Sequence, residues 1–221
     1  GDVNHLPLIR RVARTGVCVQ LDTGSSTLGE IERAVDAVLQ EGNTQIIIHQ
    51  CPSGYPARLE SVNLNIIPTL KTMFACPVGF SDHTPGRDMD IAALAIGANL
   101  VEKTITTDRT IRIVEHIMSL EPPEVGDFVK AVRDVEVALG SPRRIMSSEE
   151  RLAREAVRRS AYLKADVQAK RLLTEELVEF RRPGNGIPPD RFEELLGARV
   201  REDLPRGHRL KWADLVIGEE R

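Results

Sequence analysis

The feature that most constrains the fold is a repeated alternation of short apolar segments with amphipathic segments in the first 140 residues. The apolar segments have strand length, and the segments between them carry apolar residues at helical spacing. The predicted strands cover residues 16–21, 45–49, 78–80 and 98–104. The predicted helices cover residues 31–39, 63–74, 91–97 and about 123–139, and Thr27 with Glu30 forms a capping box before the first of them. Strands that alternate with helices indicate an α/β fold with a parallel sheet, whose strands we expect to pair in chain order.

Two architectures fit this pattern, and the pattern alone leaves both open. Four βα units are half of an eightfold TIM barrel, and they also fit an open flavodoxin-like sheet. No GxGxxG or GxxxxGK loop follows a predicted strand, which argues against the commonest nucleotide-binding sites.

The pattern changes after residue 140, which predicts a second domain. Residues 141–157 are interpreted as a linker followed by a helix at 147–157. Residues 158–221 are predicted to form a small domain of short β elements and short helices, because turn residues interrupt every apolar run.

Composition excludes several classes of partner. The net charge of −3 gives no support for binding nucleic acid or a membrane surface, and aromatic residues at 4% are too few for a base-stacking surface. No apolar run approaches the ~20 residues of a membrane span. Three cysteines without a CxxC spacing and a first segment without a targeting signal favour a cytoplasmic protein.

Polar residues cluster where the predicted strands end. Ser-Asp-His-Thr at 81–84 follows the third strand, His49 and Gln50 end the second, and Glu102 with Lys103 ends the fourth. The carboxyl ends of parallel barrel strands meet at one mouth, so a functional site is expected there. Neighbouring strand residues point to opposite faces, so His49 and Gln50 cannot both face the barrel axis.

The order of these motifs resembles the sialic acid synthase family, whose members condense phosphoenolpyruvate with N-acylated hexosamines. The matching barrel segments are Gly1-Asp2-Val3-Asn4, Leu21-Asp22-Thr23-Gly24, Gln50-Cys51-Pro52-Ser53-Gly54-Tyr55-Pro56, Gly79-Phe80-Ser81-Asp82-His83-Thr84, Glu102-Lys103-Thr104 and Glu115-His116-Ile117-Met118-Ser119-Leu120-Glu121-Pro122. In the small domain, Arg159-Ser160, residues 173–177, Arg182-Pro183-Gly184-Asn185-Gly186-Ile187 and Leu196-Gly197 resemble the family's antifreeze-like (SAF) domain.

The resemblance implies the C-terminal half of a TIM barrel in residues 1–140 and a SAF domain in residues 158–221, with the N-terminal half of the barrel absent. It implies condensation of phosphoenolpyruvate with an N-acylhexosamine-type aldose, giving a nonulosonic acid and phosphate, in a domain-swapped homodimer. The alternative is a non-catalytic carbohydrate-binding fragment or a degenerate synthase. Related phosphoenolpyruvate aldolases without a SAF domain are disfavoured by the segment at 182–187.

The resemblance also implies a divalent metal, Mn²⁺ or Mg²⁺, bound by His83 and by Gln50, which occupies the position of the family's other histidine. His49 is one residue out of register and is expected to point away from the axis unless a bulge turns it inward. The expected catalytic residues are His83, Asp82 and Lys103, the last as a phosphate clamp or, alternatively, in a rim ion pair with Glu102. The expected substrate-binding residues are Asn4, Thr23, Ser53, Tyr55, His116 and Arg182, with Arg182 reaching the sugar in the partner subunit.

Several positions depart from the family pattern. Asp22 replaces a serine, Thr104 replaces a histidine, and Gln50 replaces the metal-binding histidine. These changes suggest a different acceptor sugar or a loss of activity. The sequence leaves the acceptor open among sialic, legionaminic, pseudaminic and spore-coat types. Because half of a barrel lacks half of the strand ends, this chain alone is expected to be inactive.

Overall fold

The structure is a computed structural model that describes residues 1–216. It divides into two compact units, which meet in sequence between Gly140 and Ser141. Residues 217–221, which the sequence assigned to the small domain, lie outside the described residues.

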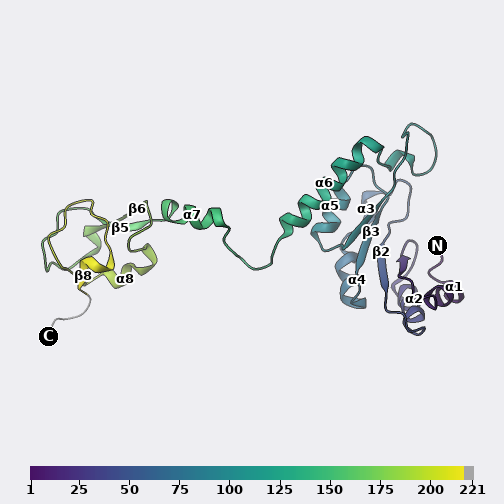
Figure 1. Ribbon diagram of the computed structural model, residues 1–221, viewed down its shortest axis with the longest axis horizontal. Helices are drawn as coiled ribbons and strands as arrows, with labels where there is room; N and C mark the ends of the chain where they lie inside the picture. Colours follow the sequence, from purple (N-terminus) through teal and green to yellow (C-terminus); the bar gives the residue numbers. More distant parts are fainter. Residues whose placement is uncertain (217–221) are drawn as a thin grey trace. The chain divides into compact units, whose positions relative to one another are not determined.

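The first unit is built on a four-stranded parallel sheet (Figure 1). The strands are β1 (Val19–Asp22), β2 (Ile46–Gln50), β3 (Val78–Asp82) and β4 (Leu100–Lys103), and they pair in the order β1-β2-β3-β4. The predicted parallel pairing in chain order is confirmed. Strand β3 extends two residues beyond its predicted end, because Ser81 and Asp82 pair with Glu102 and Lys103 of β4.

The helices of this unit are α1 (Leu6–Ala13), α2 (Leu28–Leu39), α3 (Leu59–Val62), α4 (Ile66–Phe74), α5 (Asp88–Ala95) and α6 (Pro122–Leu139). The predicted capping box of α2 is present, since Thr27 accepts from the Glu30 backbone and Glu30 accepts from the Thr27 backbone. The predicted helix from residue 63 begins only at Ile66, because Asn63 is left-handed and separates α3 from α4. Helix α1 was not predicted.

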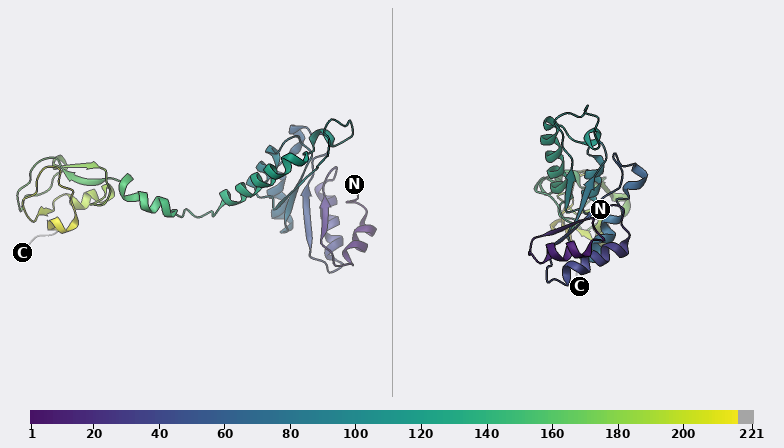
Figure 2. Two further views of the ribbon diagram at one scale, coloured as in Figure 1. Left: turned by 45° about the horizontal axis from the view of Figure 1, so that its top comes forward. Right: turned by 90° about the vertical axis from the view of Figure 1, so that its right-hand side faces the viewer.

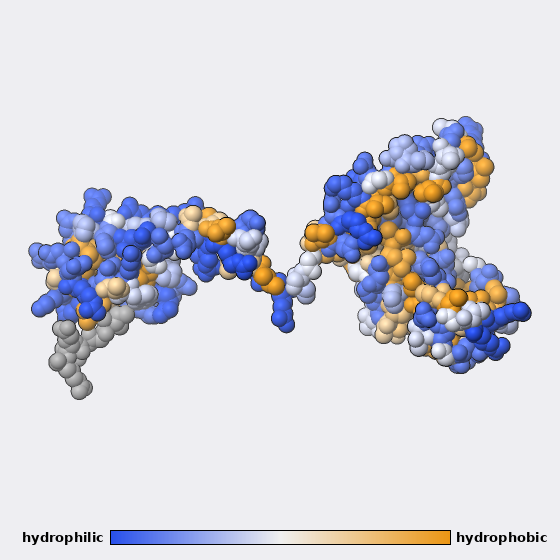
Figure 3. Space-filling model, in the orientation of Figure 1, coloured by the Kyte–Doolittle hydropathy of each residue, from blue (hydrophilic) through white to orange (hydrophobic). Residues whose placement is uncertain are grey.

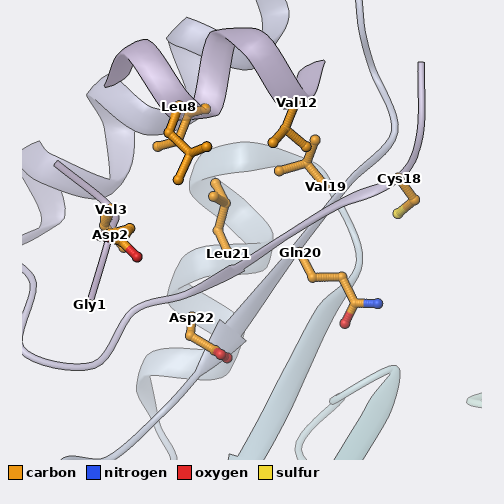
Figure 4. Close-up of a pocket in the computed structure, with 11 residues that line it drawn as sticks. Gly1, Asp2, Val3, Leu8, Val12, Cys18, Val19, Gln20, Leu21 and Asp22 are labelled. Carbon is orange, nitrogen blue, oxygen red and sulfur yellow. The ribbon is translucent and has the colours of Figure 1, made fainter. Parts of the chain in front are cut away.

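The two faces of the sheet differ in chemistry. Alternate strand residues, among them Leu21, Ile48 and Phe80, are buried against the helices in one apolar core. The opposite face is called the inner face below. Near the carboxyl ends of the strands it carries the polar side chains of Gln20, Asp22, His49, Ser81 and Glu102. In β1, Val19 and Leu21 point toward Leu8 and Val12 of α1, while Gln20 and Asp22 point the other way (Figure 4).

The second unit begins with α7 (Ser148–Val157), which lies where a helix was predicted and is capped by Ser147. Two antiparallel pairs follow, β5 (Ser160–Leu163) with β6 (Val178–Arg181) and β7 (Arg199–Val200) with β8 (Leu215–Val216), and α8 (Phe192–Leu195) precedes β7 (Figure 2). A separate apolar core holds these short elements together, with Leu163, Leu173, Ile187, Leu195 and Leu210 almost fully buried. This small β-rich unit is the one expected from the turn-rich sequence.

Exposed apolar residues of the first unit gather in the segment between β4 and α6 and along α6 (Figure 3). Ile105 is 72% exposed and Val137 is 80% exposed. Among the described residues, no helix combines the length and the apolar character needed to cross a membrane.

Candidate active site at the ends of the parallel strands

Three ionisable side chains from three strands meet on the inner face. The His49 Nδ1 atom of β2 lies 3.9 Å from Asp22 Oδ1 of β1 and 3.8 Å from Glu102 Oε2 of β4. The His49 side chain is 1% exposed, whereas those of Asp22 and Glu102 are 51% and 55% exposed. Sheet register explains the meeting, since Asp22 pairs with His49 and their side chains therefore share a face.

The orientation of the His49 ring is fixed on both sides. Its Nε2 atom lies 2.9 Å from Gln20 Oε1, an acceptor, so Nε2 carries the proton and donates. The ring lies over Gly79 of β3, where a Cβ atom would stand 2.9 Å from His49 Nδ1. The Nδ1 atom has no hydrogen-bond partner among the described residues. The ring thus presents Nδ1 to the carboxylates of Asp22 and Glu102.

Gln50 does not lie on the inner face. Its side-chain amide donates to the Val62 carbonyl of α3 at 2.9 Å, within the layer between sheet and helices. Strand β2 is regular and pairs in register on both sides, so no bulge intervenes. His49, which was expected to point away, therefore faces the inner side, and Gln50 does not; which of the two would bind a metal stays a prediction.

Lys103 is also on the helix side of the sheet. Its ammonium group pairs with Asp82, lies 3.5 Å from Asp90 Oδ2 of α5 and donates to the Thr84 carbonyl at 2.6 Å. Its side chain is only 3% exposed and donates two hydrogen bonds, to Asp82 and to the Thr84 carbonyl, while neither Asp90 oxygen has a hydrogen-bond partner among the described residues. Lys103 therefore pairs with Asp82 and not with Glu102, and the catalytic roles expected for Lys103 and Asp82 stay predictions.

Asp90 is the third member of this buried group, and sequence reasoning did not find it. Burial, with the neighbouring carboxylate of Asp82, raises the pKa of Asp90 to about 8, although Lys103 opposes that rise. One lysine cannot neutralise two buried carboxylates, so Asp90 keeps its proton near neutral pH.

His83 and Tyr55, both expected at the site, lie together. The His83 Nδ1 atom donates to the Pro52 carbonyl at 3.2 Å, and its ring centroid lies 4.5 Å from that of Tyr55. The His83 side chain is buried, while Tyr55 is 52% exposed. Since Nδ1 is engaged with Pro52, Nε2 is the His83 ring nitrogen left for a ligand.

Thr23 and Ser53 line one pocket between the loops that follow β1 and β2. Thr23 Oγ1 donates to the His49 carbonyl at 2.8 Å, and Ser53 Oγ lies 2.9 Å from Ser25 Oγ. Burial raises the pKa of the nearby Cys51 thiol, and the Asp22 carboxylate raises it further, so this cysteine is a poor nucleophile.

The remaining expected residues lie apart from this cluster in the sequence and in their contacts. Asn4 is exposed in the segment before α1. The His116 Nδ1 atom lies 3.0 Å from Thr106 Oγ1, in the segment between β4 and α6. Arg182 belongs to the second unit, where it is exposed as predicted and donates from Nε to the Val157 carbonyl at 2.7 Å.

Comparisons with known proteins agree with the motifs. Residues 1–144 match the NeuB family, and residues 158–216 match the SAF domain. This chain belongs to the NeuB family. The fold of the first unit is therefore part of a NeuB-type barrel, and the second unit is a SAF domain.

Two of the relatives are sugar-acid synthases by name. The chain is 34% identical to N,N'-diacetyllegionaminic acid synthase of Campylobacter jejuni, over 89% of this chain and 60% of that protein. It is 32% identical to human N-acetylneuraminate-9-phosphate synthase, over 90% of this chain and 56% of that protein.

A solved structure gives the same picture. The crystal structure of the spore coat polysaccharide biosynthesis protein SpsE from Bacillus subtilis matches with a TM-score of 0.60 and 30% identity, over 99% of this chain and 66% of that one. The chain thus spans about three fifths of the length of these relatives.

Proposed function

We propose that this chain forms part of an enzyme that condenses phosphoenolpyruvate with an N-acylhexosamine-type aldose, releasing phosphate and a nonulosonic acid. The observation that carries the proposal is the pairing, in one NeuB-family chain, of polar strand ends on an open inner face with a SAF domain. The names of the relatives, which make legionaminic and neuraminic acids, support the same class of product. The site would act in a homodimer in the cytoplasm.

The chemistry needs a carbon–carbon bond from C3 of phosphoenolpyruvate to the sugar aldehyde. Water then attacks C2, and phosphate leaves. A divalent cation, Mn²⁺ or Mg²⁺, would act as a Lewis acid on the aldehyde oxygen. The orphaned Nδ1 atom of His49 beside two carboxylates fits such a cation, whereas Gln50 does not.

The other residues are given roles by position. His83 offers Nε2 as a proton acceptor at the mouth, and Tyr55 packs against its ring. Thr23 and Ser53 offer hydroxyl groups in the pocket between the first two loops, where they would hold oxygen atoms of a substrate. Asn4 and His116 are proposed as further substrate contacts.

Arg182 is proposed to bind the sugar in a partner subunit's barrel, as a domain-swapped dimer requires. Its exposure and its lack of a carboxylate partner among the described residues are compatible with that role. Arg182→Ala should raise the KM for the sugar with little change in stability, while Arg171→Ala, an exposed arginine of the same unit, should change neither.

Four strands do not close a barrel. We therefore expect turnover only when four further βα units complete it, whether they come from the same polypeptide or from another one.

The test is phosphate release from phosphoenolpyruvate with Mn²⁺ and a panel of N-acylhexosamines. It is run on this chain alone and on a form that contains the completing units. Sugar-dependent phosphate release by the completed form supports the proposal. Binding of sugars without phosphate release by the completed form would instead favour the carbohydrate-binding alternative.

A further inference from the structure

We propose that Lys103, Asp82 and Thr84 are positioning residues, which hold the turn that carries His83 at the mouth of the strands. They act on the reaction through His83 and not through contact with a substrate. The inference rests on the proposed function only for what His83 does there. Its first test reads the His83 ring itself, so the positioning and the condensation reaction can fail independently.

The first support is that one side chain closes the turn around His83. The Asp82 carboxylate accepts from the Thr84 backbone N–H and from the Thr84 hydroxyl, each at 2.9 Å. Asp82 and Thr84 are 1% and 2% exposed, so water does not compete for these hydrogen bonds. Because an Asp side chain that bonds the backbone two residues further on closes a turn, it also fixes the residue between them.

The second support is that Lys103 ties this turn to the neighbouring strand from both sides. Its ammonium group donates to the Asp82 carboxylate, which precedes His83, and to the Thr84 carbonyl at 2.6 Å, which follows it. Lys103 is paired with Asp82 in the register of β3 and β4, so it reaches the turn from a fixed place in the sheet. Hydrogen bonds from an ammonium group are stronger than those between neutral groups, and this one is buried.

The third support is that the turn decides where the His83 ring lies. The His83 carbonyl accepts from the Ala57 N–H at 2.8 Å, and the ring Nδ1 atom lies 3.2 Å from the Pro52 carbonyl. The ring centroid lies 4.5 Å from that of Tyr55. These partners belong to the loop after β2, whereas the turn is held by a lysine of β4. A shift of the turn therefore moves the ring relative to the Pro52 carbonyl.

A loose turn should slow the reaction more than it weakens substrate binding. Proton transfer needs the His83 nitrogen within hydrogen-bond reach of the reacting group, and a misplacement of about 1 Å can cost about 100-fold in rate. In the form that contains the completing units, Thr84→Val should therefore lower kcat by about 10-fold or more. The KM for phosphoenolpyruvate should change less than kcat.

The first test is the position of the proton on the His83 ring in the 221-residue chain, read from long-range ¹H–¹⁵N NMR correlations at about pH 7.5, where an ordinary histidine is mostly neutral. In the parent chain the proton should sit on Nδ1, which faces the Pro52 carbonyl. Thr84→Val removes the hydroxyl at nearly constant volume and should shift part of the population to the Nε2-protonated ring. Lys103→Gln should do the same, and Thr84→Ser, which keeps the hydroxyl, should retain the parental pattern.

Two controls should keep the parental His83 pattern. Thr72→Val removes an exposed hydroxyl that donates to the Pro68 carbonyl of α4, and Asp90→Asn keeps the shape of the buried acid beside Lys103. The proposal is overturned if Thr84→Val, or a folded Lys103→Gln chain, also keeps that pattern. It is equally overturned if Thr84→Val leaves the kcat of an active completed form unchanged.

An inactive completed form would count against the proposed function, while the NMR comparison would still decide the positioning.

Discussion

Two charged clusters stand on opposite faces of the same parallel sheet, near the same ends of the strands. On the helix side, Lys103 is enclosed with Asp82 and Asp90, and its ammonium group donates to Asp82 and to the Thr84 carbonyl. On the inner face, His49 lies between Asp22 and Glu102, and one of its nitrogens has no partner.

The two clusters differ in access to solvent. The side chains of Lys103, Asp82 and Asp90 are almost fully enclosed, whereas those of Asp22 and Glu102 are about half-exposed, so only the inner-face cluster can be reached by a ligand. Charge alone would not have distinguished the two clusters, since each holds two carboxylates and one nitrogen base.

The largest change in stability should come from removing the lysine of the helix-side cluster. Lys103→Met leaves the buried Asp82 carboxylate without its cation, and loss of one partner of a buried ion pair costs about 3–5 kcal/mol. Urea unfolding measures the change. Lys130→Met removes an exposed ion pair with Asp134 on α6 and should have no measurable effect. If Lys103→Met is as stable as the parent chain, the buried ion pair of Lys103 does not stabilise the fold.

A second effect should come from filling the space under the His49 ring. Gly79→Ala would place a Cβ atom 2.9 Å from His49 Nδ1, so the ring must move. We expect a loss of about 1–3 kcal/mol from overpacking, together with weaker Mn²⁺ binding by calorimetry.

The control for that substitution is Gly29→Ala on α2, where the new Cβ atom meets only Arg33 Nη1 at 3.7 Å. It should be neutral or stabilising by about 0.5–1 kcal/mol, because alanine favours a helix interior. Retention of full metal affinity in Gly79→Ala would contradict the ring position described above.

The helix-side cluster should also show in the pH dependence of stability. The pKa of Asp90 is raised from 3.8 to about 8 in the folded chain. Its contribution to stability is therefore fully present below pH ~4, near the pKa of Asp90 in the unfolded chain. It is lost as the pH rises toward 8, the pKa in the folded chain. Asp90→Asn should change stability little at pH 5 and should flatten this decline at higher pH.

Thermal or urea unfolding of both proteins between pH 5 and pH 9 checks the prediction. Asp88→Asn, an exposed carboxylate on the same helix, should keep the parental pH dependence. Parallel curves for Asp90→Asn and the parent chain would show that Asp90 is ionised in the folded state.

The smallest effect, a negligible change in Mn²⁺ affinity, should come from Gln50→His. Because this side chain faces α3 and donates to the Val62 carbonyl, a histidine there cannot reach the inner face. Its Mn²⁺ affinity should match that of the parent chain within about twofold, as expected for sites that do not interact. Calorimetry that shows tighter binding would restore the register predicted from sequence.

The sequence by itself determined the order of the strands, the boundary after residue 140 and the family. Short apolar segments between amphipathic helices admit few topologies, and the motifs of residues 79–84 and 182–187 are specific in their spacing. These features depend on local pattern and order along the chain, which a sequence records directly.

Only the tertiary structure decided which strand-end side chains face each other. The run Ile46-Ile47-Ile48 before His49 and Gln50 shows no alternation, because a strand buried on both faces is apolar throughout, so it does not say which residue points inward. For the same reason, the sequence did not predict that Lys103 is buried or that Asp22 and Glu102 lie close together. A shift of one residue moves a side chain to the other face of a sheet, and only the register with neighbouring strands and helices removes that ambiguity.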